Sequence, residues 1–100
     1  MAAYVIADTE IVDPGLGARY RELAQKSIAH YGGRYIVRGG EVEPVEGDWL
    51  PHLFVVVEFP SMDRARQWYR SPEYAEALDL RQTALRRRLI FVEGIEAPTA

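Results

Sequence analysis

Hydrophobic residues recur along this chain with two different periods, which predict the order of its secondary structure elements. Residues 3–11 are rich in β-formers, and the runs 53–59 and 89–92 are almost continuously apolar, as in buried strands. Between them, residues 14–31 repeat apolar side chains at spacings of three and four, which is typical of a helix with one buried face. That predicted stripe consists of Leu16, Tyr20, Leu23, Ala24, Ile28 and Tyr31.

Two glycine pairs in the first half of the chain predict boundaries of secondary structure. Asp13-Pro14 predicts the start of the first helix, because an acidic N-cap precedes a proline at the first helical position. Gly32-Gly33 is expected to end this helix and Gly39-Gly40 to kink a short strand over residues 34–38, since glycine takes positive φ at little cost. We expect the strand to resume over 41–46 and to turn at Gly47-Asp48.

Serine and proline residues predict the later boundaries. Ser61 is a suitable N-cap for a second helix, and Ser71-Pro72 interrupts it and caps a further helix over residues 73–86. The last strand is expected over residues 88–93, and a short polar tail occupies residues 97–100.

The predicted order β-α-β-β-α-β defines an α+β, ferredoxin-like fold with a four-stranded antiparallel sheet and helices on one face. Residues 1–96 are expected to form this single domain. The strands at 53–57 and 89–92 are apolar on both faces, although an antiparallel sheet with one face in water should alternate. We therefore predict a homodimer whose sheets face each other, which is a dimeric α/β barrel with a pocket in or beside it.

The composition of the chain argues against several kinds of site and partner. The chain has no cysteine, so it has no disulfide and no thiolate metal site. Its formal net charge of −3 argues against nucleic-acid binding, and no segment is long and apolar enough to span a membrane. The run Arg86-Arg87-Arg88 is interpreted as a set of cations at a helix C-terminus. The first residues lack the pattern of a signal peptide, so we expect none there and expect a cytoplasmic location.

Several segments resemble one family along nearly the whole chain. They are the glycine-bracketed run 32–40, Glu46-Gly47-Asp48-Trp49, residues 57–61, residues 68–74 and residues 89–94. These segments resemble the family called domain of unknown function 1330. The resemblance implies a ferredoxin-like subunit of the dimeric α/β-barrel superfamily and no established activity. Relatives in that superfamily include cofactor-independent oxygenases, haem-degrading enzymes, lactone isomerases and stress-responsive proteins.

Arg38 and Glu58 are the first candidates for chemistry. If the two middle strands form a hairpin about Gly47-Asp48, counting places Arg38 nearly opposite Glu58. Arg38 would then hold a substrate carboxylate or enolate while Glu58 moves a proton. The alternative is an ion pair that only fixes the register of the strands. Arg34 is a further anion-binding candidate, or else a solvated arginine.

Aromatic residues supply candidates for a ligand pocket. Tyr31, Trp68 and Tyr69 would line a site for a flat apolar molecule, or else they belong to the core between helices and sheet. Trp49 lies on the predicted turn, so a pocket lid, a dimer contact and simple exposure stay open.

The two histidines complete the candidate list. His30, in the catalytic set, and His52, before the third strand, are each a possible general base or else a surface histidine. Neither has a second ligand at metal-binding spacing, so we expect no metal and no cofactor. The hypotheses left open are a cofactor-free enzyme acting on a small organic acid or aromatic molecule, a ligand-binding or stress-related module without turnover, and a pure interaction unit.

Overall fold

The structure of the protein is a computed structural model that describes residues 1–96. The predicted tail, residues 97–100, lies outside the described residues. Seven elements follow one another along the chain: β1 (Ala3–Ile11), α1 (Pro14–His30), β2 (Arg34–Arg38), β3 (Leu53–Phe59), α2 (Met62–Tyr69), α3 (Pro72–Ala84) and β4 (Leu85–Glu93). The strands form one antiparallel sheet in the order β2-β3-β1-β4, which confirms the predicted ferredoxin-like fold. No helix within residues 1–96 has the length and apolarity needed to cross a bilayer.

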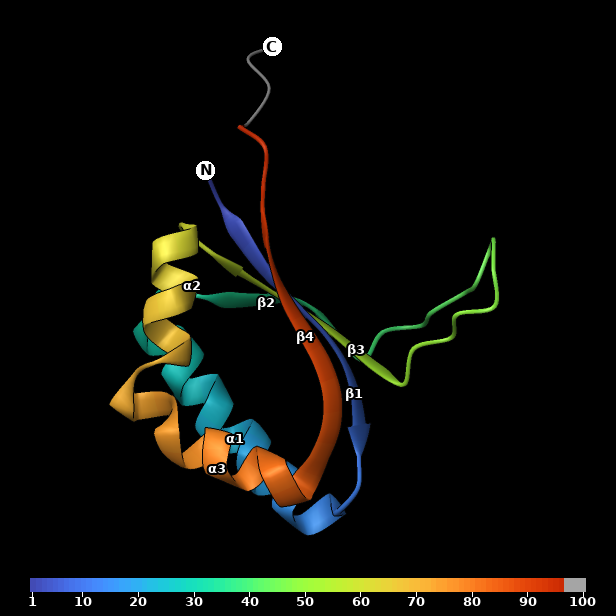
Figure 1. Ribbon diagram of the computed structural model, residues 1–100, viewed down its shortest axis with the longest axis horizontal. Helices are drawn as coiled ribbons and strands as arrows, with labels where there is room; N and C mark the ends of the chain where they lie inside the picture. Colours follow the sequence, from blue (N-terminus) through green and yellow to red (C-terminus); the bar gives the residue numbers. More distant parts are fainter. Residues whose placement is uncertain (97–100) are drawn as a thin grey trace.

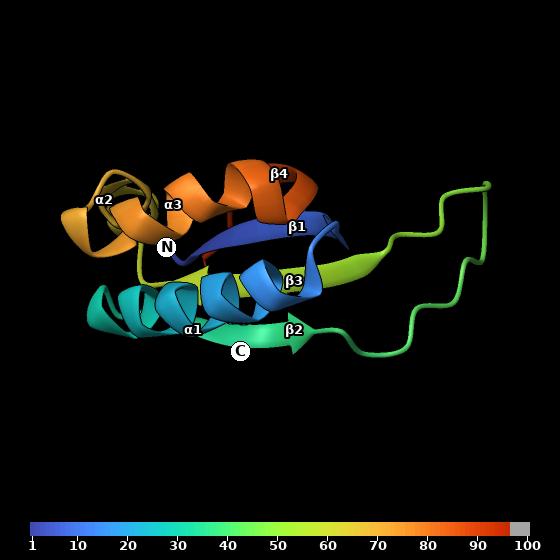
Figure 2. The ribbon, with the colours of Figure 1, turned by 90° about the horizontal axis from the view of Figure 1, so that it is seen from below.

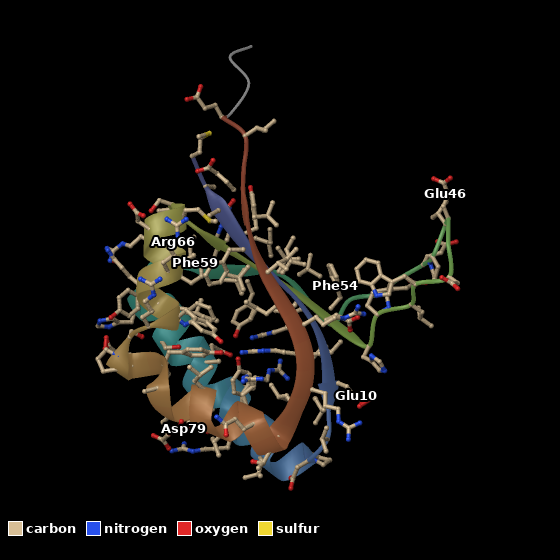
Figure 3. The ribbon with its side chains drawn as sticks, in the orientation of Figure 1. Glu10, Glu46, Phe54, Phe59, Arg66 and Asp79 are labelled. Atoms are coloured by element: carbon tan, nitrogen blue, oxygen red, sulfur yellow. The ribbon has the colours of Figure 1, made fainter. Side chains whose placement is uncertain are left out.

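All three helices lie on one side of the sheet (Figure 1). Strand residues alternate between the two faces, so odd-numbered residues of β1, β3 and β4 face the helices and even-numbered ones face the opposite side, which we call the open face. Figure 3 shows the division on β3, where Phe59 points toward α2 and Phe54 lies on the other side of the sheet.

The local signals for the helices act as predicted. The Asp13 carboxylate accepts a hydrogen bond from the Leu16 amide at 3.1 Å, and the hydroxyls of Ser61 and Ser71 cap α2 and α3 in the same way. Gly32 follows α1 with φ of 80°, a conformation that would strain a residue with a Cβ.

Trp68 is the centre of the hydrophobic core. It is only 2 % exposed, and its ring lies 4.3 Å from that of Tyr74 and 5.5 Å from that of Phe59, measured between centroids. Its indole nitrogen donates a hydrogen bond to the Ser27 hydroxyl at 3.0 Å, which satisfies the polar atom that burial would otherwise leave without a partner. This core joins α1, α2 and α3 to one end of the sheet.

The strand predicted over residues 41–46 is not formed. Residues 39–52 instead make a long irregular connection, which we call the arm, and it projects away from the body of the protein (Figures 1 and 2). The Gly39 amide makes one further bond to the Phe54 carbonyl at 3.0 Å, and Gly39 then takes φ of 73°. Pro44 and Pro51 supply no amide hydrogen, so the ladder does not extend through these two positions. The carboxylate of Glu46 lies at the tip of the arm (Figure 3).

The last strand begins earlier than predicted. Helix α3 ends at Ala84, whose carbonyl accepts hydrogen bonds from the amides of Val12 and Asp13. The three arginines at 86–88 therefore lie in β4 and not at a helix C-terminus, so their interpretation as partners of the helix dipole is wrong. Consecutive strand residues alternate in direction, which separates Arg87 from its two neighbours.

Replacing Gly33 by alanine should lower the free energy of unfolding by about 1–3 kcal/mol. A Cβ at this position would lie 2.7 Å from Cε1 of Phe59 and 2.8 Å from Cγ2 of Ile28, both within the core. Gly40→Ala is the matched control, because a Cβ there meets nothing within 4 Å. Urea denaturation measures both variants, and equal midpoints for the two would contradict the expected close packing.

Candidate functional site

A cavity of about 1020 Å³ lies between α1 and the helix-facing side of the sheet. Its walls are mainly apolar side chains from four elements: Val5, Ala7, Ala24, Ile28, Val55, Val57 and Leu89. Trp68 closes the cavity at the core. Exposed lining residues, among them Arg21 and Arg38, mark its open side between α1 and the end of β2. The cavity is large enough for an organic molecule of several rings.

Arg87 enters the cavity from β4, opposite Thr9 of β1. Its guanidinium donates one hydrogen bond to the Tyr74 hydroxyl at 2.7 Å and another to the Tyr20 hydroxyl. The two hydroxyl oxygens lie 2.6 Å apart and share a hydrogen bond. We call Arg87, Tyr20 and Tyr74 the Arg87 cluster; it joins β4, α1 and α3.

The Arg87 cluster has more donors than acceptors. The bond between the hydroxyls of Tyr20 and Tyr74 uses one of their two hydrogens, so the other stays free to donate. The buried Nε of Arg87 has no hydrogen-bond partner within residues 1–96. A buried donor without an acceptor costs roughly 1–3 kcal/mol. This end of the cavity is therefore suited to a ligand that accepts hydrogen bonds.

Electrostatics add a positive charge to this excess of donors. Burial raises the pKa of Tyr74 far above its usual range, so the hydroxyl keeps its proton at neutral pH. Burial by itself would lower the pKa of Arg87, but the interactions with Tyr20 and Tyr74 raise it overall, so the guanidinium stays charged. The arrangement can bind a carboxylate, phenolate or enolate oxygen.

Arg38 lies at the open side of the same cavity. Its guanidinium carbon lies 4.4 Å from the centroid of the Tyr35 ring, and Nη1 donates to the side-chain oxygen of Gln25 at 3.1 Å. The predicted position opposite Glu58 is wrong, since Arg38 pairs with Val55.

Glu58 pairs with Arg34 instead, on the open face and outside the cavity. Arg34 Nε donates to Glu58 Oε1 at 2.8 Å, and the Tyr4 hydroxyl donates to Oε2 at 3.3 Å. The predicted register of the two strands is wrong for two reasons. The arm is not a symmetric hairpin, and the β2–β3 register shifts at Ile36 and not at the second glycine pair. The geometry fits the ion pair that fixes register, now made by Arg34.

His30 and Tyr31 lie at the end of α1, and neither lines the cavity. Both side chains meet Glu73: the Tyr31 hydroxyl donates to its carboxylate at 2.6 Å, and His30 Nε2 lies 3.7 Å from the same oxygen. The hydrogen bond to Glu73 is the largest of the effects that raise the pKa of Tyr31. This cluster links α1 to α3 at an exposed position.

The remaining aromatic candidates fall into two groups. Trp68 is a core residue that also lines the closed end of the cavity, whereas Tyr69 packs against Trp68 and Phe91 and does not line it. Trp49 lies at the base of the arm, where its ring packs against Phe54 on the open face.

Asp8 fixes the base of the arm to the open face. Its carboxylate accepts hydrogen bonds from the His52 amide at 2.9 Å and the Trp49 indole at 3.2 Å, and Arg88 Nη2 lies 3.6 Å away. The hydrogen bond from the His52 backbone is the main reason why the pKa of Asp8 is lowered. The imidazole of His52 lies 3.4 Å from Glu10. Within residues 1–96 no group of three or more potential ligands is arranged to hold a metal ion.

The sequence analysis missed Arg87 as a site residue and did not join Tyr20 to Tyr74. Alternation within the last strand was the available signal for Arg87: with Leu89 and Phe91 facing the helices, Arg87 must face them too. No sequence signal pairs the two tyrosines, because they come from helices that meet only in the folded protein.

Comparisons with known proteins agree with this fold. A family model described as a domain of unknown function (DUF1330) matches residues 2–95. No curated protein matches the chain.

Solved structures of the same fold include several proteins of unknown function. A protein from Rhodopseudomonas palustris is 20% identical, with a TM-score of 0.74 over 96% of this chain and 84% of that one. A protein from Thermobifida fusca, described as dimeric and ferredoxin-like, is 19% identical, with a TM-score of 0.64 over 93% and 91%. A putative antibiotic biosynthesis monooxygenase from Nitrosomonas europaea is 12% identical, with a TM-score of 0.62 over 99% and 94%.

Proposed function

The chain belongs to the DUF1330 family, and from its own geometry we propose that it binds a small, flat organic anion in the cavity between α1 and the sheet. The single observation that carries this proposal is the Arg87 cluster. A charged guanidinium lies there whose hydrogen-bond partners within residues 1–96 are two neutral hydroxyls, in a cavity whose other walls are mainly apolar. Such a site suits a ligand that carries one anionic group on an apolar body.

The cluster favours an anionic ligand over a neutral one because protein carboxylates do not neutralise it. Within residues 1–96, no carboxylate lies within 4.0 Å of the Arg87 guanidinium, whose partners are the two tyrosine hydroxyls. A buried charge is stabilised when an opposite charge with good hydrogen-bond geometry approaches it. A carboxylate or phenolate oxygen of a ligand would supply that charge.

We also propose that the protein is a homodimer formed through the open face, as in a dimeric α/β barrel. Apolar side chains occupy the middle of this face, among them Ile6, Val56 and Ile90, and Ile90 is 56% exposed. Charged pairs lie toward its ends, such as Arg34 with Glu58. The description of the Thermobifida fusca protein as dimeric supports this assembly.

Binding of 2-naphthoate tests the ligand proposal. Titration calorimetry on the wild-type protein should show binding of this acid, and the neutral 2-naphthamide should bind at least about tenfold more weakly because it lacks the charge. Arg87→Met should weaken 2-naphthoate binding by a similar factor. Arg88→Met is the matched control, since Arg88 lies on the open face and should leave the affinity unchanged.

Equal affinity for the acid and the amide would refute an anion site without recourse to any variant. Mass spectrometry of the recovered acid separates the two functional classes that the cavity allows. An unchanged mass corresponds to a binding protein without turnover. A changed mass that depends on Arg87 corresponds to an enzyme that needs no added cofactor. The description of the Nitrosomonas europaea protein as a putative antibiotic biosynthesis monooxygenase supports an enzyme of some kind.

A further inference from the structure

The arginines of the open face and those of the cavity differ in their partners. On the open face, Arg34, Arg86 and Arg88 each lie within 4.0 Å of a carboxylate, those of Glu58, Glu10 and Asp8 respectively. The arginines that line the cavity are Arg21, Arg38 and Arg87, and within residues 1–96 none of them has a carboxylate at that distance. The cavity therefore carries three arginines that no carboxylate neutralises, although the chain as a whole is acidic. Arg64, Arg70 and Arg81, which lie outside the cavity, share this lack of a carboxylate within residues 1–96.

The other charged groups of the cavity lining do not cancel this excess. Glu22 and Lys26 are the remaining charged lining residues, and they lie 3.7 Å from each other as an ion pair on α1. Glu22 also lies 3.7 Å from Arg19. The carboxylate of Glu22 is thus already shared by two cations outside the Arg87 cluster.

Arg38 is held in the way that Arg87 is, by neutral groups. Its guanidinium lies over the Tyr35 ring and donates to Gln25, and neither partner removes its charge. Arg21 lies near the same tyrosine: burial raises the pKa of Tyr35, while the charges of Arg38 and Arg21 act to lower it. Arg38 and Arg21 therefore form a second cationic position at the open side of the cavity.

The two cationic positions start from opposite edges of the sheet. Their guanidinium groups are held by different partners, Tyr20 and Tyr74 for Arg87 and Gln25 for Arg38. Arg38 lies on β2 and Arg87 on β4, which are the opposite edges of the sheet, with β3 and β1 between them. Three strand spacings separate them by about 14 Å at the backbone. They are also offset by two residues along the strands, because Arg38 is level with Ala7 and Arg87 with Thr9. Apolar residues fill the lining between them.

We propose that the ligand is an elongated dianion, with one anionic group at the Arg87 cluster and the other at Arg38 and Arg21. This inference rests on the proposed function and adds to it the ligand's second charge and its length. The apolar lining between the two positions favours a rigid aromatic body.

A series of aromatic acids tests the inference. The probes are 2-naphthoate, naphthalene-2,6-dicarboxylate and biphenyl-4,4′-dicarboxylate, titrated into the full chain by calorimetry at low ionic strength. At least one dicarboxylate should bind about tenfold or more tightly than 2-naphthoate. Arg38→Gln should remove this advantage and change the affinity for 2-naphthoate less than about twofold.

Arg34→Gln is the matched control, because Arg34 lies on the same strand but on the open face. It should leave the affinities for all three acids unchanged. If 2-naphthoate binds and neither dicarboxylate binds more tightly, the dianion inference is overturned and the proposed function stands. If Arg38→Gln weakens the binding of all three acids by the same factor, the inference of a second anion-binding position is also overturned. Absence of binding by every acid overturns both proposals.

Discussion

Val56→Asp should convert the proposed dimer into a monomer. Val56 lies on the open face of β3, paired with Ile6 of β1 and Val37 of β2, so it occupies the middle of the apolar area. An unpaired carboxylate buried between two sheets costs several kcal/mol, and a twofold dimer would bury two of them. The dissociation constant of the dimer should therefore increase by at least about a thousandfold.

Analytical ultracentrifugation at several concentrations measures this change. Ala75→Asp is the control, because Ala75 is exposed on α3, on the helical side of the protein. It introduces the same side chain and should leave the dimer intact. A wild-type monomer, or a Val56→Asp protein that stays dimeric at micromolar concentration, would show that another surface or no surface mediates assembly.

Trp68→Ala should lower the free energy of unfolding by about 3–5 kcal/mol. The indole is 2 % exposed and packs between Phe59 and Tyr74, so its removal leaves a cavity in the centre of the core. The substitution also leaves the Ser27 hydroxyl without the donor that it accepts from. Loss on this scale is a large part of the stability of a domain of this size.

The other tryptophan of the chain provides the comparison. Trp49 is 56% exposed and contributes one hydrogen bond to Asp8 and one ring contact with Phe54. Trp49→Ala should cost less than about 1 kcal/mol. Circular dichroism during urea denaturation measures both variants without depending on tryptophan fluorescence. Similar losses for the two would show that Trp68 is not the centre of the core.

The fold could be predicted because its signals are local. Asp13, Ser61 and Ser71 cap helices through hydrogen bonds within one turn, and Gly32 takes the positive φ that ends α1. The continuous apolar pattern at residues 53–57 also indicates a sheet with two apolar faces. Each of these signals acts over a few residues, so the sequence alone reveals it.

The candidate site was harder to predict because it depends on distant contacts. The partner of Glu58 is set by the length of the arm and by a shift of register at Ile36, and counting from a turn reveals neither. Tyr20 and Tyr74 meet only because α1 and α3 pack side by side. The sequence predicts Arg38 as a site residue through a contact with Glu58, whereas in the structure Arg38 pairs with Val55 and lines the cavity.

The three consecutive arginines of β4 make the positive charge of the cavity tolerant of errors in folding. If β4 slipped by one residue against β1, Arg86 or Arg88 would take the place of Arg87, but a second arginine would then replace Leu85 or Leu89 on the helix-facing side. Gly94 adds a further penalty, since a side chain in its place would lie 2.9 Å from the carbonyl oxygen of Ala2. A mispaired strand would therefore be less stable than the correct one, although an arginine would still occupy the cavity.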